Sequence, residues 1–84
     1  SVLKIDRQFI ARMTQSSQDQ QIVKMIIELG HLLKMEVIAE GIETEQQYQV
    51  LQQLGCDAGQ GYFIGRPMPL EAVQEWLTHH QGDA

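Results

Sequence analysis

Val37-Ile38-Ala39-Glu40-Gly41 is the stretch that decides the fold, because a short apolar run is followed at once by a carboxylate and a glycine. The apolar run, residues 37–39, predicts a buried strand. The glycine predicts a loop where that strand ends. Strands this short and this apolar are typical of a parallel sheet that is covered by helices on at least one side.

A long amphipathic segment precedes this strand. Ser16-Ser17 is a favourable helix start, and Ser17 with Gln20 fits a capping box. Asp19 suits the positive end of the helix dipole, and Lys34 suits the negative end. We therefore predict a helix of about four turns with one wide apolar stripe. The stripe consists of Ile22, Val23, Ile26, Ile27, Leu29, Leu32 and Leu33.

A second amphipathic segment follows the strand. Thr44 with Gln47 fits another capping box, and Glu45 is favourable in the first helical turn. Gly55 is well placed to end this helix. The apolar stripe that the helix is expected to bury consists of Tyr48, Leu51 and Leu54.

Two further strands and a third helix complete the pattern. Residues 2–6 predict the first strand, and residues 61–64 predict the third strand. Between the first strand and the long helix, residues 7–14 predict a connection with some helical character. Residues 66–69 predict a rigid loop before a helix that begins near Pro69. Because strands alternate with helices, the predicted fold class is α/β, with three consecutive βα units and parallel strands.

The composition excludes several kinds of protein. The chain of 84 residues has one cysteine, so it forms no internal disulfide, and its three histidines show no spacing typical of a structural zinc site. A net charge of -5 argues against a surface that binds DNA or RNA. No apolar run approaches the roughly 18 residues that a membrane helix needs. The single cysteine suits the reducing cytoplasm.

Three polar residues belong to the strands or to their carboxyl ends, where α/β folds bind ligands. Lys4 lies within the first strand, Glu40 ends the second, and Gln60 leads into the third. Because side chains alternate along a strand, Lys4 points away from the side of its apolar neighbours. Glu40 on the adjacent strand is its natural partner. The pair has two interpretations, a functional site and an ion pair that only fixes the strands.

Four separate motifs resemble those of the EAL domain family. They are Lys4-Ile5-Asp6, Ala39-Glu40-Gly41-Ile42-Glu43, Gly55-Cys56-Asp57 with Gln60-Gly61-Tyr62, and Arg66-Pro67-Met68. Their order and spacing extend the resemblance over residues 2–77. Active members of that family are metal-dependent phosphodiesterases that hydrolyse cyclic di-GMP, a bacterial second messenger.

The resemblance implies a variant (β/α)₈ barrel, similar to a TIM barrel but with one strand reversed. Residues 1–84 would form its C-terminal portion, units six to eight. The chain opens on Ser1 directly before a strand, so we expect a piece of a longer protein whose partner is the rest of the EAL barrel. The family's other metal-binding motifs lie upstream of these units, and we expect the isolated chain to be inactive.

The resemblance also implies roles for individual residues. Lys4 matches a lysine that contacts the catalytic water or the scissile phosphate, Glu40 matches a metal-binding glutamate, and Gln60 matches a polar residue at the floor of the site. Positions that face or support the substrate match Glu43, Arg66, Pro67 and Met68. The implied cofactor is a pair of Mg²⁺ or Mn²⁺ ions, and the implied ligand is cyclic di-GMP.

Alternatives to hydrolysis stay open. One is a non-catalytic EAL-like module that binds cyclic di-GMP or a partner protein. Another is that the 84 residues are a fragment without activity. The first and third strands would each have an open edge, which predicts self-association into a homo-oligomer. The expected location is cytoplasmic, or at a membrane through upstream domains.

Several other polar residues have structural interpretations. Asp6 is predicted to cap a strand end or loop, and Asp57 is predicted to form a turn. Cys56 is predicted to be a small buried residue rather than a nucleophile, because no histidine is well placed beside it. For His31, a role at the helix dipole or on the surface is sufficient.

Overall fold

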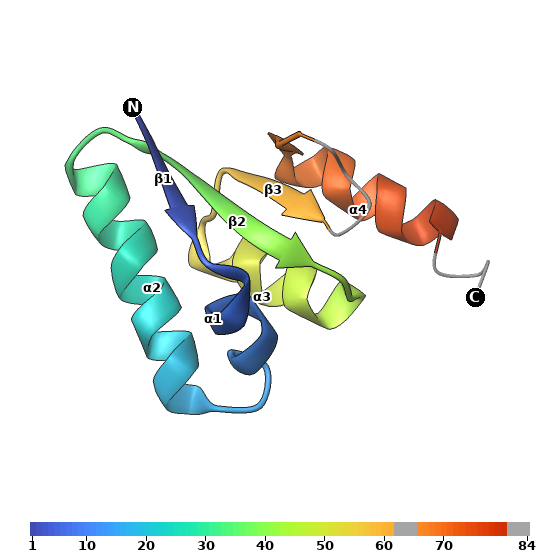
Figure 1. Cartoon of the computed structure of the whole chain (residues 1–84), viewed down its shortest axis with the longest axis horizontal. Coiled ribbons are helices and arrows are strands. Elements are labelled where there is room, and N and C mark those ends of the chain that lie inside the picture. The colour runs from blue at the N-terminus through green and yellow to red at the C-terminus, as the bar shows by residue number, and fades with distance from the viewer. Residues whose placement is uncertain (62–65, 81–84) are drawn as a thin grey trace.

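The computed structural model describes residues 1–61 and 66–80. Its elements follow the predicted alternation of strands and helices (Figure 1). In chain order they are β1 (Val2–Ile5), α1 (Arg7–Arg12), α2 (Ser17–Leu32), β2 (Glu36–Ile42), α3 (Glu45–Leu54), β3 (Ala58–Gly61), β4 (Met68–Pro69) and α4 (Leu70–His80).

One sheet joins all the described strands in the order β1-β2-β3-β4. β1, β2 and β3 are parallel, which confirms the α/β fold class with helical crossovers. β4 is a two-residue strand that pairs with β3 in the antiparallel direction. The sequence predicts a loop at these residues, and that prediction is wrong for Met68 and Pro69. A proline is tolerated there because β4 is an edge strand, where a residue without an N–H need not break a hydrogen bond of the sheet.

The third strand begins earlier than predicted. β3 starts at Ala58 and ends at Gly61, whereas the prediction placed the strand at residues 61–64, of which 62–64 lie outside the described residues. Close packing requires a glycine at position 59 of β3. A Cβ atom on Gly59 would lie 2.4 Å from Cδ1 of Ile42 and 3.1 Å from Cγ2 of Val73. Glycine in a strand therefore marks a close approach here, not a loop.

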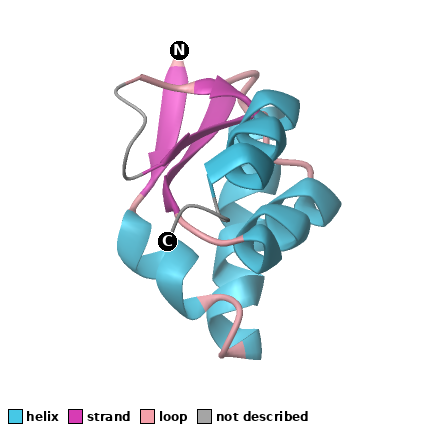
Figure 2. Cartoon of the chain, turned by 90° about the vertical axis from the view of Figure 1, so that its right-hand side faces the viewer, coloured by secondary structure: helices cyan, strands magenta, loops and turns pink. Residues whose placement is uncertain are grey.

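α2, α3 and α4 lie together on one side of the sheet (Figure 2). The core between this side and the helices includes alternate strand residues such as Ile5, Val37 and Ala39. The helices and the C-cap of α1 contribute most of the remaining buried side chains. These are Ile10, Met13, Val23, Ile27, Tyr48, Leu51, Leu70, Val73 and Leu77. The opposite side of the sheet carries the intervening residues of each strand.

The start of α2 differs from the prediction by one residue. Ser16 is the N-cap, with an extended backbone (φ -138°, ψ 118°), and its hydroxyl accepts a hydrogen bond from the amide of Asp19 at 3.2 Å. Ser17 is already helical, so the predicted capping box of Ser17 with Gln20 does not form. The side-chain Nε2 of Gln20 instead donates to the carbonyl of Met13 at 3.5 Å.

Only part of the predicted apolar stripe of α2 is buried against the sheet. Val23, Ile27 and Gly30 are buried. Three leucines of the predicted stripe are exposed, together with the neighbouring Met25, so the stripe is wider than the surface that packs against this sheet. The exposed fractions are 67% for Met25, 53% for Leu29, 78% for Leu32 and 60% for Leu33.

α2 and α3 end in the same hydrogen-bonded turn, but with different residues at its left-handed position. Gly55 ends α3 with φ 85°, as predicted from its position after the helix. After α2 the corresponding residue is Lys34, with φ 59°. In each turn the next amide bonds back into the helix, from Cys56 to Leu51 at 3.0 Å and from Met35 to Gly30 at 2.8 Å. A side chain in this conformation costs free energy that glycine avoids.

We therefore expect Lys34→Gly to raise the free energy of unfolding by about 0.5–1 kcal/mol, and Gly55→Ala to lower it by about 1 kcal/mol. Both changes act on the same turn in opposite directions, so each serves as the control for the other. Denaturant titration of the two variants beside the wild type measures both shifts. A destabilised Lys34→Gly protein would contradict the strain that we assign to Lys34.

Candidate functional site

Lys4 and Glu40 form an ion pair across adjacent strands. Nζ of Lys4 lies 3.9 Å from Oε2 of Glu40, as the alternation of the strands predicts. Lys4 is the Cα partner of Ile38 in the parallel register, two residues before Glu40 on the same side of β2. The side chains keep 53% and 39% of their exposure, so the pair lies on the side of the sheet that α2, α3 and α4 leave open. The Lys4–Glu40 pair is therefore exposed to solvent and is not a buried ion pair.

Gln60 lies on the same open side of the sheet. It is the Cα partner of Glu40 in the β2–β3 ladder, and paired residues of a parallel sheet point to one side. The prediction placed Gln60 before the third strand, but it lies within β3 and is half-buried. The structure thus brings Lys4, Glu40 and Gln60 from three neighbouring strands to one surface.

A bulge in β2 follows Glu40 directly. The register with β3 shifts between Glu40 and Ile42, and Gly41 has φ 78°. The extra residue lets Ile42 enter the core beside the helices while Glu40 stays on the open side. A Cβ atom on Gly41 would lie 2.6 Å from Cβ of Arg7, so this position has neither the conformation nor the space for a side chain.

Glu43 lies in the short connection between β2 and α3. Its side chain is exposed, and its amide donates to Oε1 of Gln47 at 2.7 Å. The capping box of Thr44 with Gln47 is present as predicted. The Thr44 amide donates to Oε1 of Gln47 at 3.2 Å, and the Gln47 amide donates to Oγ1 of Thr44 at 3.1 Å.

The other predicted substrate-facing residues lie near β4. Arg66 and Pro67 are exposed. Met68 is half-buried in β4, where it pairs with Gly59 and packs against the core. Asp6, which the sequence assigns to capping, is the N-cap of α1 and accepts a hydrogen bond from the amide of Gln8 at 2.8 Å.

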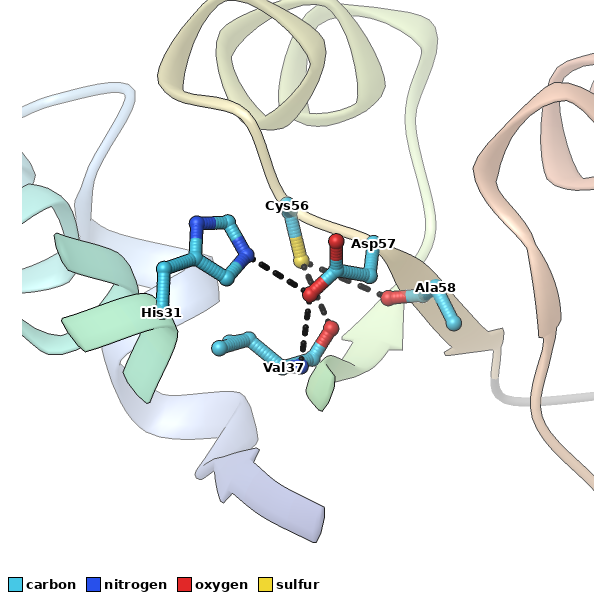
Figure 3. A network of polar contacts seen from close by, with 5 residues as sticks. All are labelled: His31, Val37, Cys56, Asp57 and Ala58. Carbon is cyan, nitrogen blue, oxygen red and sulfur yellow. Dashed lines mark hydrogen bonds and ion pairs between the residues drawn. The ribbon is translucent and has the colours of Figure 1, made fainter. Parts of the chain in front are cut away.

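Asp57 joins three elements at the opposite end of the sheet, where β2 and β3 begin (Figure 3). Its Oδ2 accepts a hydrogen bond from the amide of Val37 at 2.8 Å and lies 2.7 Å from Nε2 of His31. The sequence predicts only a turn at Asp57 and a dipole or surface role for His31. Both predictions miss this contact, because the two residues are 26 positions apart and no local pattern connects them.

Cys56, next to Asp57, is a buried thiol. Its Sγ lies 3.5 Å from the carbonyl oxygen of Val37 and 3.4 Å from that of Ala58, and its one hydrogen is shared between these two acceptors (Figure 3). Burial raises the pKa of the thiol to about 11, although nearby backbone hydrogen bonds act in the other direction. Since the thiolate is the nucleophile, Cys56 is structural, as predicted.

Glu40 is the one predicted metal ligand in the chain. A carboxylate suits Mg²⁺ or Mn²⁺. Within residues 1–61 and 66–80, however, no group of three or more histidine, cysteine, aspartate or glutamate side chains is arranged to hold a metal ion. The described residues do not amount to a metal site by themselves.

None of the helices in residues 1–61 and 66–80 combines the length and the apolar character that a membrane-spanning helix requires.

Comparison with known proteins shows which family and solved structures this chain is similar to. The family model described as EAL domain matches residues 1–67. From Pseudomonas aeruginosa, the bifunctional diguanylate cyclase/cyclic di-GMP phosphodiesterase MucR is 49% identical over 73 residues, which are 87% of this chain and 11% of that protein. The cyclic di-GMP phosphodiesterase NbdA of the same organism is 42% identical over 82 residues, which are 98% of this chain and 10% of that protein.

A solved structure titled "PaMucR Phosphodiesterase, c-di-GMP complex" superposes with a TM-score of 0.72 and 48% identity. The match covers 87% of this chain and 30% of that chain. The chain thus spans about a tenth of the length of the curated relatives that it matches.

The bulge at Gly41 generates a prediction about stability. Gly41→Ala combines a left-handed backbone with a collision against Arg7, so we expect a loss of about 2 kcal/mol or more. Gly55→Ala is the matched control, because Gly55 has a similar positive φ but no atom within 4 Å of the added Cβ. Denaturant titration measures both. Equal losses in the two variants would show that crowding against Arg7 contributes nothing.

The buried thiol generates a second prediction. At pH 8 only about one Cys56 side chain in a thousand is ionised in the folded chain, whereas a free cysteine is ionised to roughly a quarter. We therefore expect alkylation by iodoacetamide to be slow in buffer and fast in denaturant. The alkylated fraction is measured by mass spectrometry at timed intervals. Rapid labelling under conditions where the chain is fully folded would contradict the assignment of a raised pKa.

Proposed function

The chain belongs to the EAL domain family, and on this premise we propose that it forms part of a phosphodiesterase that hydrolyses cyclic di-GMP to the linear dinucleotide. The observation that carries the proposal is the surface shared by Lys4, Glu40 and Gln60 on neighbouring parallel strands. Strand ends of this kind are where α/β barrels hold their reacting groups.

Lys4 and Glu40 have complementary roles in this proposal. In the reaction water attacks one phosphorus atom, one P–O bond breaks, and negative charge grows on the phosphate oxygens. The Lys4 ammonium group, beside the attacking water or a phosphate oxygen, offsets that charge. The Glu40 carboxylate holds Lys4 in place and offers oxygen ligands to a divalent cation. Gln60 contributes a polar contact next to Glu40.

We further propose that the remaining metal ligands come from residues outside this chain. The support is the donor set, because one carboxylate cannot hold two divalent ions. Bound Mg²⁺ or Mn²⁺ would activate water and neutralise phosphate charge. The net charge of -5 would otherwise repel a dianionic substrate.

The sheet edge and α2 support the proposal that this chain is units six to eight of a barrel. β1 is the edge strand of the sheet. Leu29 and Leu33 lie two residues before and after His31, which places them about 200° round the helix from it. His31 faces Asp57 beside β3, so these leucines face the side of the open β1 edge. A preceding strand and helix would cover both surfaces, and in an isolated chain the same surfaces favour self-association.

The proposal predicts different outcomes for two glutamates of β2. In the full protein that contains this chain, Glu40→Gln and Lys4→Met should each lower kcat/KM for cyclic di-GMP about 100-fold or more. Glu36→Gln is the matched control, because Glu36 is exposed at the other end of the same strand and should change kcat/KM less than about 2-fold. Timed hydrolysis with Mg²⁺ or Mn²⁺, followed by chromatography of the nucleotides, measures all three.

The wild-type result separates the alternatives. Hydrolysis that depends on Glu40 supports the enzyme. Tight binding of cyclic di-GMP without hydrolysis would replace it with a non-catalytic binding module. The isolated 84 residues should show no turnover, and metal-dependent turnover by them would contradict the proposal that ligands come from elsewhere.

A further inference from the structure

Gln47 is the one buried polar or charged residue in the described parts of the chain, with 8% of its surface exposed. It lies in the first turn of α3. Burying an amide costs free energy unless its hydrogen bonds are made. Oε1 of Gln47 accepts two hydrogen bonds, from the backbone amides of Glu43 and Thr44. These bonds fix the Gln47 side chain and the backbone of both residues.

Oε1 of Gln47 does more than an ordinary capping box requires. The motif needs one bond, from the amide of the N-cap residue Thr44, and that bond is 3.2 Å long. The same oxygen accepts the amide of Glu43 at 2.7 Å, the shorter of the two. The buried side chain therefore holds the backbone of the residue that precedes the helix cap.

Glu43 lies between two buried anchors. On one side Ile42 is 1% exposed and packs in the core, and on the other side Gln47 binds the Glu43 amide. The backbone from the bulge at Gly41 to the start of α3 is thereby fixed, while the carboxylate of Glu43 stays exposed at the carboxyl end of β2.

We propose that Gln47 is a positioning residue, which sets the place of the Glu43 carboxylate relative to the Lys4–Glu40 pair through its bond to the Glu43 amide. This inference rests on the proposed function, because it gives Glu43 a part in binding or hydrolysing cyclic di-GMP. In this proposal Gln47 acts through the Glu43 backbone and makes no contact of its own with substrate or metal. Small misplacements of a group that aligns a substrate cost large factors in rate.

Two substitutions separate the acceptor oxygen from the shape of the side chain. Gln47→Glu keeps an oxygen at the same place, and a glutamate serves equally well in a capping box. Gln47→Met keeps the length but leaves the amides of Glu43 and Thr44 without this acceptor. Thr44→Ala is the matched control, since it removes the other half of the capping box and leaves the bond to Glu43 in place.

The test is a double-mutant cycle in the full protein that contains this chain, at a temperature where all variants are folded. We expect Gln47→Met to lower kcat/KM for cyclic di-GMP about 10-fold, and Gln47→Glu and Thr44→Ala less than about 3-fold. In a Glu43→Ala background, Gln47→Met should have less than about a 2-fold effect, because its route of action is gone. Where Glu43→Ala is too slow to time, the same cycle is measured on the Kd of cyclic di-GMP.

Each outcome decides the matter. Equal losses from Gln47→Met with and without Glu43 would show that Gln47 only stabilises the fold, and so would equal losses from Gln47→Met and Thr44→Ala. An active wild type with either result overturns the positioning role and leaves the proposed function intact. A wild type that neither hydrolyses nor binds cyclic di-GMP removes the proposed function, and this inference with it.

Discussion

The arrangement depends on one constraint, which is that α2, α3 and α4 cover a single side of the parallel sheet. Strand residues alternate between the two sides, so the covered side takes apolar residues, whereas the open side holds polar residues beside the apolar Ile38. Lys4 and Glu40 can thus sit in strands without losing their access to solvent. Charges placed on the covered side would be buried, with a desolvation cost that their attraction seldom repays.

The separation of core residues from the open side depends on one break in the regular alternation of β2, at the bulge after Glu40. Without the bulge at Gly41, Ile42 would face the same side as Glu40 and the core would lose a buried residue. The bulge also begins the segment that carries Glu43 to the buried oxygen of Gln47. The bulge at Gly41 therefore affects both the packing of the core and the geometry of the candidate site.

Local chemistry could be predicted from the sequence, and long-range choices could not. Alternation within a strand predicted the pairing of Lys4 with Glu40, and side-chain capping predicted the start of α3 at Thr44. Spacing does not say which part of a wide apolar stripe faces the chain's own sheet, so the exposure of Leu32 was missed. Nor does it distinguish the glycine of a close approach, Gly59, from the glycine of a loop. The roles assigned to Lys4, Glu40, Gln60 and Glu43 all remain predictions.

Asp57 shows that the contacts that hold the fold together lie apart from the residues proposed for chemistry. Its contacts to His31 and Val37, and the bond from the Leu70 amide to its carbonyl at 3.3 Å, tie four segments together at the end of the sheet farthest from the carboxyl ends of the strands. The groups that hold the architecture and the groups that would do chemistry thus share almost no members. Under natural selection, a lineage could lose the polar residues of the open side and keep its architecture. Such a lineage would keep the fold and lose the proposed activity.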